Sequence, residues 1–326
     1  MRIITWNANG AYRKKFERLE ALQPDIVIVQ EAEPDFFEKR GLPYVWTGKD
    51  PKKKGIGVYA MNQHSTLERA DIVESKHMMP IIYREHGMEL HILAVWSQKD
   101  GGSDYIEGMN KDMPKYQGFL YHPNSFVIGD WNSSVALDEK YGGEEVGHNV
   151  LVRLLESWNL GSAYHYSQGM DAHGKEKHPT FFHRKEMDNP FHIDYFFAPK
   201  KLLPQIKEVS VGHPDEWIKL SDHMPLIVDI QLDSIQKNDE GIKWTFAKTY
   251  ALSAPHEYVL QRNYPEYFAQ MQAKIAKEGT DEPFTLFGNT KVYRYIYTES
   301  HRYWVDEDVL NRDSRYGRKV GSTKAV

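Results

Sequence analysis

Ser221, Asp222 and His223 place a carboxylate beside an imidazole, directly before the apolar run Leu226 to Ile230. On a loop that enters a strand, one of these side chains can bind a metal ion while the other contacts a phosphate or transfers a proton. Four further polar clusters stand at the ends of predicted strands: Asn7 and Asn9 in TWNANG, Glu31 in DIVIVQE, Asp130 and Asn132 in FVIGDWN, and Asp194 in HIDYFF. Together they predict one cleft lined by carboxylates, amides and a histidine.

These residue types suit the hydrolysis of a phosphodiester. The reaction needs in-line attack by a water, neutralisation of the charge on the nonbridging oxygens and help for the leaving alkoxide. A carboxylate base, a divalent metal and a cationic histidine supply these. No serine or cysteine nucleophile is indicated. The chain contains no cysteine, so disulfides and thiolate metal sites are excluded, and oxygen or imidazole must hold any metal.

Short apolar runs predict the strands that position the first polar clusters. Arg2 to Trp6 is rich in β-forming residues and leads to the first asparagines. Ile26 to Val29 is continuously apolar, which is typical of a strand buried on both faces, and it ends close to Glu31. A helix is expected over about residues 12–22 between them, stopped near Pro24, so the order strand, helix, strand indicates an α/β fold.

A third short strand, Phe126 to Ile128, leads to Asp130. Because side chains alternate along a strand, Asp130 and Asn132 are expected to face the cleft while Trp131 packs into the core. The run of lysines at 52–54 is interpreted as a solvated loop rather than a phosphate contact.

The five segments ITWNANG, PDIVIVQE, VIGDWN, HIDYFF and SDHMPL, in this order, resemble the motifs of the endonuclease/exonuclease/phosphatase superfamily. That superfamily includes exonuclease-III-like apurinic endonucleases, deoxyribonuclease I and the poly(A) deadenylases. Five motifs in family order are far more specific than any single one. The resemblance covers residues 1–232 and implies a four-layer α/β sandwich of two mixed sheets flanked by helices.

The resemblance also implies a metal centre. Glu31 would be the principal carboxylate on a catalytic Mg²⁺ or Mn²⁺, and Asp222 and Asn9 would complete the shell directly or through water. Hard oxygen ligands and retained waters are what Mg²⁺ prefers.

The catalytic roles follow from the same resemblance. Asp130 would orient and deprotonate the attacking water, and His223 would donate to a phosphate oxygen or stabilise the charge of the transition state. Asp194 would orient His223 and raise its pKa. The remaining matches are Asn132 and Asn7, which would position the phosphate and Asp130, and Tyr105, which lies where family nucleases place a phosphate-contacting tyrosine.

Singly, several of these residues have ordinary structural explanations. Asn7 could cap the following helix, Glu31 could be a loop carboxylate, and Asp130 with Asn132 could form an Asx turn. A carboxylate in the apolar, aromatic surroundings of Asp194 is different, because it needs a buried partner. The charged segment at 183–185 is explained equally well by phosphate contact and by a solvated turn, and His192 is a candidate cleft residue because it lies two positions before Asp194.

The chain beyond the sandwich is expected to form a separate small unit. Residues 233–241 are polar and lack periodicity, which predicts a linker, and residues 242–326 predict a small α+β domain. Within it we expect a helix over about 265–277 and a hairpin formed by 291–298 and 301–305. The alternating tyrosines at 293, 295 and 297 would share one strand face, either as a base-stacking platform or as the core of a small sheet. Nucleic acid and protein are the candidate partners of this domain.

Composition narrows the function classes. The formal net charge of −5 argues against a generic binder of polyanions, so nucleic acid would be held by local patches. No apolar run is long enough for a membrane span, and a strand that starts at once leaves no room for a signal peptide, so we expect a cytoplasmic protein without membrane contact.

We therefore expect a divalent-metal-dependent phosphodiester hydrolase, a nuclease with DNA favoured over RNA as its substrate. The alternatives are a phosphatase or phosphodiesterase on a nucleotide or lipid headgroup, and a binding protein whose functional part is the C-terminal domain. Ala32 and Glu33 stand where exonuclease-III-like enzymes carry threonine and lysine, which weighs against specificity for abasic sites.

Overall fold

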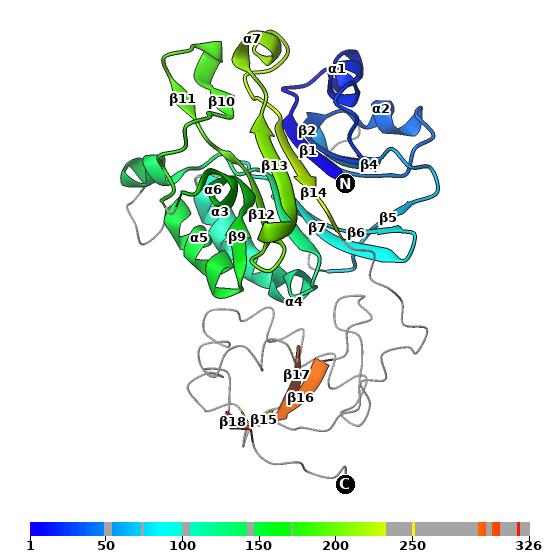
Figure 1. Ribbon diagram of the computed structural model, residues 1–326, viewed down its shortest axis with the longest axis vertical. Coiled ribbons are helices and arrows are strands. Elements are labelled where there is room, and N and C mark those ends of the chain that lie inside the picture. Colours follow the sequence, from blue (N-terminus) through cyan, green and yellow to red (C-terminus); the bar gives the residue numbers. More distant parts are fainter. Residues whose placement is uncertain are drawn as a thin grey trace. The chain divides into compact units, whose positions relative to one another are not determined.

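Two six-stranded sheets form the larger part of the described chain in the computed structural model (Figure 1). The structure describes residues 1–48, 54–72, 75–99, 105–141, 147–170 and 172–232, together with short strands at 250–251, 293–297, 302–306 and 318–319. The strands of the first sheet are β1 (Arg2–Asn7), β2 (Ile26–Ala32), β3 (Tyr44–Thr47), β4 (Gly55–Ala60), β13 (Ile206–Val211) and β14 (Leu226–Ile230). Their order is β13-β14-β1-β2-β4-β3, with β1 parallel to β2 and antiparallel to β14.

The second sheet is also mixed. Its strands are β5 (Thr66–Arg69), β6 (Met78–Glu85), β7 (Met88–Trp96), β8 (Ser125–Asp130), β9 (Leu160–Ser162) and β12 (Asp194–Pro199). They follow the order β5-β6-β7-β8-β12-β9, and β7 runs parallel to β8 while β12 runs antiparallel to it. A separate two-stranded ribbon joins β10 (Phe181–Phe182) to β11 (Pro190–Phe191).

The main core lies between the two sheets, because apolar side chains from both form one buried cluster. The first sheet contributes Ile3, Ile26, Ile28, Val58 and Val228, and the second contributes Met79, Ile81, Ile92, Phe126, Ile128 and Phe196. Burying such side chains supplies about 25 cal/mol for each Å² of apolar surface removed from water. The two sheets are therefore held face to face by their inner side chains.

Helices cover the outer faces and complete four layers (Figure 1). The outer face of the first sheet packs against α1 (Phe16–Glu20), α2 (Pro34–Glu38) and α7 (Pro214–Trp217) through a second buried cluster. Beside the second sheet lie α3 (Tyr105–Asp112), α5 (His148–Ser157) and α6 (Ala163–Gln168), and a short α4 spans Gln117–Leu120. The predicted sandwich of two mixed sheets flanked by helices is confirmed.

The helix expected over residues 12–22 is interrupted, and this part of the prediction was wrong. A 3₁₀ turn, Tyr12–Lys14, is followed by the short α1, because Lys15 between them adopts φ −128°, outside the helical range. The Lys15 ammonium donates to the Ala8 carbonyl at 2.6 Å, and Glu33 accepts from the Tyr12 N–H at 3.0 Å. These contacts hold the polar loop after β1 in place of a longer helix. The other 3₁₀ helices are Met113–Tyr116, Val135–Tyr141, His183–Lys185 and Leu203–Gln205.

The chain divides into two units, of which the first comprises residues 1–70, 74–113 and 123–235 and the second residues 71–73, 114–122 and 236–326. In the second unit, β15 (Tyr250–Ala251), β16 (Tyr293–Tyr297), β17 (Arg302–Asp306) and β18 (Arg318–Lys319) form a sheet in the order β17-β16-β15-β18. The strands β16 and β17 pair antiparallel, as the predicted hairpin requires. The predicted linker at 233–241 and helix at 265–277 lie outside the described residues.

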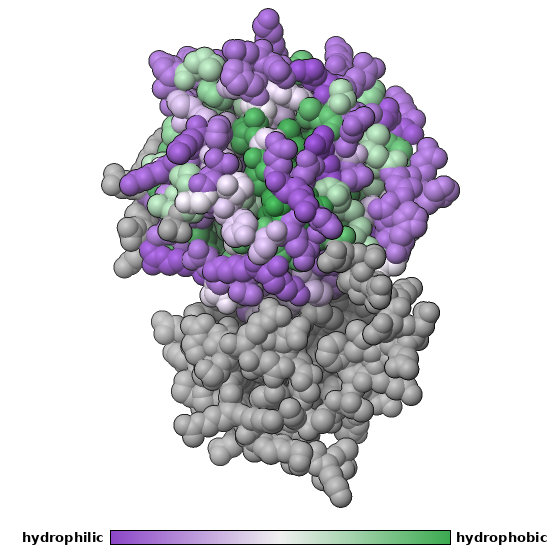
Figure 2. Space-filling model, in the orientation of Figure 1, coloured by the Kyte–Doolittle hydropathy of each residue, from purple (hydrophilic) through white to green (hydrophobic). Residues whose placement is uncertain are grey.

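The described surface is mainly polar. Figure 2 shows that hydrophilic residues dominate the visible face of the coloured part, with hydrophobic residues near its middle. The large apolar side chains that the described residues expose are Tyr44, Tyr166 and Met187. None of the helices in those residues combines the length and the apolar character that crossing a membrane requires.

Candidate active site

The polar clusters meet at one edge of the sandwich because of strand register. Asn7 at the end of β1 lies beside Gln30 of the parallel strand β2, directly before Glu31. In the second sheet, Asp194 at the start of β12 pairs with Asp130 at the end of the antiparallel strand β8. The two sheets are joined at this edge by a hydrogen bond of 2.8 Å from Asn7 Nδ2 to Asp130 Oδ2.

Asn7 holds two of the predicted acidic residues. Its Nδ2 also donates to Glu31 Oε1 at 3.2 Å, and its Oδ1 accepts from the Asn9 N–H at 2.9 Å. The amide therefore fixes Glu31 relative to Asp130 and shapes the loop that follows β1. The alternative in which Asn7 merely caps the following helix does not apply, because Ala11 is the N-cap residue of that helix.

A β-bulge in β2 sets the position of Glu31. Val29 pairs with Gly57 and Ala32 with Gly55, so β2 carries an extra residue where Glu31 adopts φ 57°, in the left-handed region. Non-glycine residues seldom adopt this conformation, and they do so most often at functional sites. The bulge thus redirects the Glu31 side chain at the edge of the sheet.

Asp130 is completely buried and accepts hydrogen bonds on both oxygens. The Asn132 N–H donates to Oδ1 at 2.8 Å, which is an Asx turn, and Asn132 Nδ2 lies 3.1 Å from Oδ2. Asn132 Nδ2 also donates to the Ser97 carbonyl at 3.0 Å. Burial raises the pKa of Asp130, and the nearby Asp194 raises it further, while His223 and the bond from Asn7 oppose the rise. Its carboxylate is thus a stronger base than an exposed one.

The loop bearing His223 is fastened to β1 through the main chain. Ser221 Oγ donates to the Asn7 carbonyl at 2.7 Å and accepts from the His223 N–H at 3.1 Å. The Trp6 indole donates to the His223 carbonyl at 2.8 Å from a fully buried position. These contacts connect residues more than 200 positions apart in the chain.

The imidazole of His223 lies between two buried carboxylates. Its Nδ1 is 2.9 Å from Asp194 Oδ2, and its Nε2 is 3.9 Å from Asp130 Oδ2. Thr180 Oγ1 accepts from the Asp194 N–H at 3.0 Å and so holds the second carboxylate in place. Burial alone would lower the pKa of His223, but the charges of Asp194 and Asp130 and the bond to Asp194 outweigh it and raise the pKa to about 10. The ring is therefore a cation at neutral pH.

The ligand atoms of Asp130, Asp194 and His223 all lie within 4.8 Å of one another. A metal could in principle occupy such a group, but metal binding requires a neutral imidazole. Because the Nδ1 of His223 is committed to Asp194 and the ring is protonated, an ion pair describes this group better than a metal site does.

The three predicted metal ligands, Glu31, Asn9 and Asp222, lie around Asn7 and the loop after β1. Asn9 Nδ2 donates to Asp222 Oδ1 at 3.0 Å, and Asn9 adopts φ 51°. Glu31 Oε2 already has a cationic partner, because the Lys54 ammonium lies 2.6 Å away. Two carboxylates and an amide oxygen form a donor set of the hard kind that Mg²⁺ and Mn²⁺ prefer, so the residues present fit a divalent ion.

Tyr105 begins α3 and is tied to the site through the main chain. Its carbonyl accepts from Ser97 Oγ at 2.7 Å, and the Lys99 ammonium lies 5.2 Å from the centre of its ring. The Ser97 carbonyl in turn accepts from Asn132, so Ser97 links Tyr105 to the residue that donates to Asp130. A contact of its hydroxyl with phosphate stays a prediction.

Sequence reasoning missed the cations that surround the predicted metal ligands. Lys54 is exposed, as a solvated loop predicts, but its ion pair with Glu31 was not foreseen. Lys15 is half-buried, and burial and the neighbouring Lys185 lower its pKa, with Lys54 adding to the effect. Lys15 and Lys54 lie in loops, which have no periodic sequence pattern. The only sequence feature that indicated a role for Lys54 is that the lysine run directly precedes β4. His192 is not brought to Asp130 or His223 by any hydrogen bond among the described residues; it donates from Nδ1 to the His178 carbonyl at 2.8 Å.

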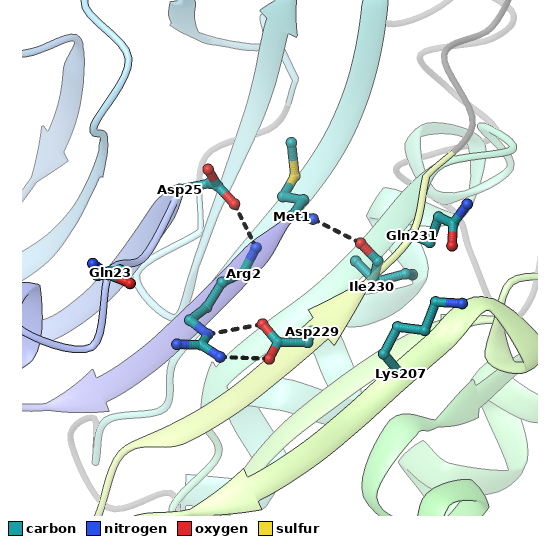
Figure 3. Close-up of a pocket in the computed structure, with 8 residues that line it drawn as sticks. All are labelled: Met1, Arg2, Gln23, Asp25, Lys207, Asp229, Ile230 and Gln231. Carbon is teal, nitrogen blue, oxygen red and sulfur yellow. Dashed lines mark hydrogen bonds and ion pairs between the residues drawn. The ribbon is translucent and has the colours of Figure 1, made fainter.

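A pocket of about 460 Å³ lies at the opposite end of β1 (Figure 3). It is lined by Arg2 and Asp229, which form an ion pair at 2.7 Å, and by Met1, Gln23, Asp25, Lys207, Ile230 and Gln231. Arg2 and Asn7 are the two ends of β1, so at about 3.3 Å per residue the pocket is on the order of 15 Å from the carboxylate cluster. It is therefore separate from the candidate active site.

Comparison with solved structures places this arrangement in a known fold. The endonuclease domain of TRAS1, a telomere-specific non-LTR retrotransposon, is 16% identical with a TM-score of 0.54, covering 71% of this chain and 98% of that one. A 3′-5′ exonuclease (NExo) from Neisseria meningitidis is 18% identical with a TM-score of 0.55, covering 71% and 100%. An AP endonuclease from Archaeoglobus fulgidus is 17% identical with a TM-score of 0.52, covering 71% and 100%. No family model and no curated protein matches the sequence.

The chain therefore shares the α/β sandwich fold of these three proteins, which is the fold that the resemblance of its five motifs implied.

Proposed function

We propose that this protein is a divalent-metal-dependent phosphodiester hydrolase, and specifically a nuclease that cleaves DNA. The observation that carries the proposal is the buried array of Asp194, His223 and Asp130, which is joined through Asn7 to Glu31. It combines a base, a cation and hard oxygen donors at one edge of the fold.

Asp130 is the base in this proposal. Its pKa is raised by burial, so it accepts a proton from water more readily than an exposed carboxylate does. The two bonds from Asn132 and the one from Asn7 orient its oxygens toward the attacking water.

His223 is the cation that meets the phosphate. Asp194 binds Nδ1 and leaves Nε2 as the donor toward the cleft, where it stabilises negative charge on a phosphoryl oxygen. A charged hydrogen bond of this kind is stronger in a buried site, where water does not compete.

Glu31, Asp222 and Asn9 would hold Mg²⁺ or Mn²⁺, which when bound supplies positive charge for the phosphate and the leaving oxygen. Lys54 is the present cationic partner of Glu31, and it would be free to contact a phosphate if a divalent cation took that place.

DNA is the proposed substrate for two reasons. One protein of similar fold, the 3′ phosphatase NExo from Neisseria, was solved bound to a product DNA hairpin. In addition, Lys185 and Lys54 both lie close enough to Lys15 to lower its pKa, so three lysines gather near Asp222 and Glu33 on a chain of net charge −5.

The test is a substrate panel with the full-length chain, with Mg²⁺ or with EDTA. The substrates are closed circular duplex DNA, labelled linear duplex and single-stranded DNA, RNA of the same sequence, a 3′-phosphorylated oligonucleotide and p-nitrophenyl phosphate. Nicking of the circular DNA identifies endonuclease action, because a circle has no ends, whereas digestion of linear DNA alone identifies an exonuclease.

The matched control is His223→Ala, which should reduce the rate by about 100- to 10,000-fold. Equal cleavage by the variant would assign the activity to a contaminating nuclease and contradict the proposal. Release of phosphate from the small or 3′-terminal ester alone would identify a phosphatase instead, and preference for RNA would correct the substrate.

A further inference from the structure

A cluster of histidines around Glu176 lies apart from the candidate active site. His165 Nε2 is 3.1 Å from Glu176 Oε1, and His173 Nδ1 is 4.0 Å from the same oxygen. These three ligand atoms all lie within 4.8 Å of one another, and at most a tenth of each side chain is exposed. They come from α6 and from the loop that follows it, so they assemble locally.

Two more histidines adjoin this group. The rings of His148 and His173 are 6.2 Å apart, and burial lowers the pKa values of His148 and His192 although the charge of Glu176 opposes it. His148, His173 and His192 each have one buried ring nitrogen with no hydrogen-bond partner among the described residues: Nε2, Nδ1 and Nε2, respectively. Buried polar atoms almost always find partners, so three in one place require an explanation.

In His192, His165 and His148, the ring nitrogen Nδ1 contacts a protein oxygen, as is usual in histidines that bind a metal through Nε2. His192 donates from Nδ1 to the His178 carbonyl at 2.8 Å, so in the neutral ring Nε2 carries the free lone pair. His165 Nδ1 lies 2.8 Å from Ser162 Oγ, and His148 Nδ1 lies 2.8 Å from Ser133 Oγ. Metal-binding histidines are generally fixed in this way, with one nitrogen bonded to a protein oxygen and the other directed to the metal.

We infer that His165, His173 and Glu176 form a second metal site, of the class that binds Zn²⁺ or a similar transition metal. Two imidazoles and a carboxylate are a donor set that zinc uses with one further ligand, and a water would supply that ligand because His148 and His192 stand outside the group of mutually close ligand atoms. Nitrogen donors disfavour Mg²⁺ and Ca²⁺, so this site differs in chemistry from the oxygen-lined catalytic centre.

The distances permit this with a small adjustment. Ligands at about 2.1 Å from a tetrahedral ion lie roughly 3.4 Å apart. The stacked rings of His165 and His173 have centroids 3.6 Å apart, so they must splay when an ion enters between their nitrogens and Glu176. The site would tie α6 and residues 173–176 together, beside the segment in which His192 precedes Asp194.

The experiment measures metal in the full-length protein, purified without a polyhistidine tag. Mass spectrometry should find about one Zn²⁺ per chain in the wild type and in Glu31→Gln, whose change lies in the other centre. Glu176→Gln and His173→Asn should each lose it. Glu176→Gln keeps an oxygen for the bond from His165, so its fold, checked by circular dichroism, is expected to persist.

Titration of the chelator-treated protein with Co²⁺ supplies an independent optical signal. The site is supported by a visible Co²⁺ band that saturates at one equivalent and persists in excess Mg²⁺. In the two variants the affinity for Co²⁺ should fall by more than about 10-fold. Absence of Zn²⁺ and of the Co²⁺ band from the wild type, metal retained by both variants, or binding without saturation at one equivalent would each overturn it. Loss of Zn²⁺ only in Glu31→Gln would place the ion in the catalytic centre and overturn it as well.

Discussion

Replacing Asp194 with asparagine isolates the charge that keeps His223 protonated. Asp194 Oδ2 accepts from His223 Nδ1 at 2.9 Å, while the buried Oδ1 has no partner among the described residues. The asparagine amide nitrogen can take the place of Oδ1, and its oxygen can keep the bond from Nδ1. The substitution therefore removes a negative charge with little change in shape.

The magnitude follows from the distance. Two unit charges 2.9 Å apart attract by on the order of 5 kcal/mol at an effective dielectric constant of about 20, which corresponds to roughly three to four pKa units. The pKa of His223 is raised to about 10 against its ordinary value of 6.5. Without the charge of Asp194, burial opposes protonation and Asp130 alone favours it, so the pKa should return to near neutrality.

The assay is the pH profile of kcat/KM for DNA cleavage by both proteins between pH 6 and 10. A raised pKa means that His223 is charged below it, so wild-type activity should persist until the pH approaches about 10. The Asp194→Asn profile should fall from near pH 7, giving little difference at pH 6 and a deficit of about 100-fold at pH 9, since each pH unit above a pKa removes tenfold of the protonated form.

A second readout does not depend on the substrate. Nitrogen-15 NMR of the imidazole, assigned by its absence in His223→Asn, should show the same downward shift of the His223 pKa in Asp194→Asn. If Asp194→Asn changes neither the pH at which kcat/KM falls nor the His223 pKa measured by NMR, Asp194 does not control the charge of His223. The proposed electrostatics would then be wrong.

Three other substitutions test neighbouring parts of the site. Glu31→Gln should raise the Mg²⁺ concentration for half-maximal activity by at least about 10-fold, as a metal titration will show, and an unchanged curve would move the ion elsewhere. Lys54→Gln should lower that concentration by up to about 5-fold, because it removes a competing cation worth about 0.2–1 kcal/mol; a rise would assign Lys54 to metal retention. Trp6→Phe leaves the buried His223 carbonyl without its indole donor and should lower the free energy of unfolding in urea by about 1–3 kcal/mol, whereas an unaltered midpoint would show that the bond contributes nothing.

Much of the candidate active site could be predicted, because its residues lie at the ends of strands that the sequence indicates. The apolar run Ile26 to Val29 predicts a buried strand, and the end of that strand places Glu31 beside the residues that follow β1. The pairing of Asp194 with Asp130 was not visible in the sequence, since it depends on the antiparallel register of strands 64 residues apart. The bulge at Glu31 was also hidden, because nothing in its residue type requires φ 57°.

The lysines of the candidate active site and the histidine cluster lie mainly in loops, and the sequence did not predict them. Lys54 reaches Glu31 and Lys15 reaches the Ala8 carbonyl from segments without periodicity, and charged residues in such segments usually face water. The histidine cluster around Glu176 joins one turn of α6 to a loop, so its members share no strand or helix spacing. Only the contact of their rings in three dimensions distinguishes them from scattered surface histidines.

The most direct test of the central claim is the position of a divalent ion in a crystal of the protein soaked with Mn²⁺. Anomalous scattering should place Mn²⁺ at coordination distance from a Glu31 carboxylate oxygen, on the side of Asp222 and Asn9, with Lys54 displaced. An ion bound instead between Asp130, Asp194 and His223, or no ion at either place under conditions in which the enzyme is active, would contradict the account.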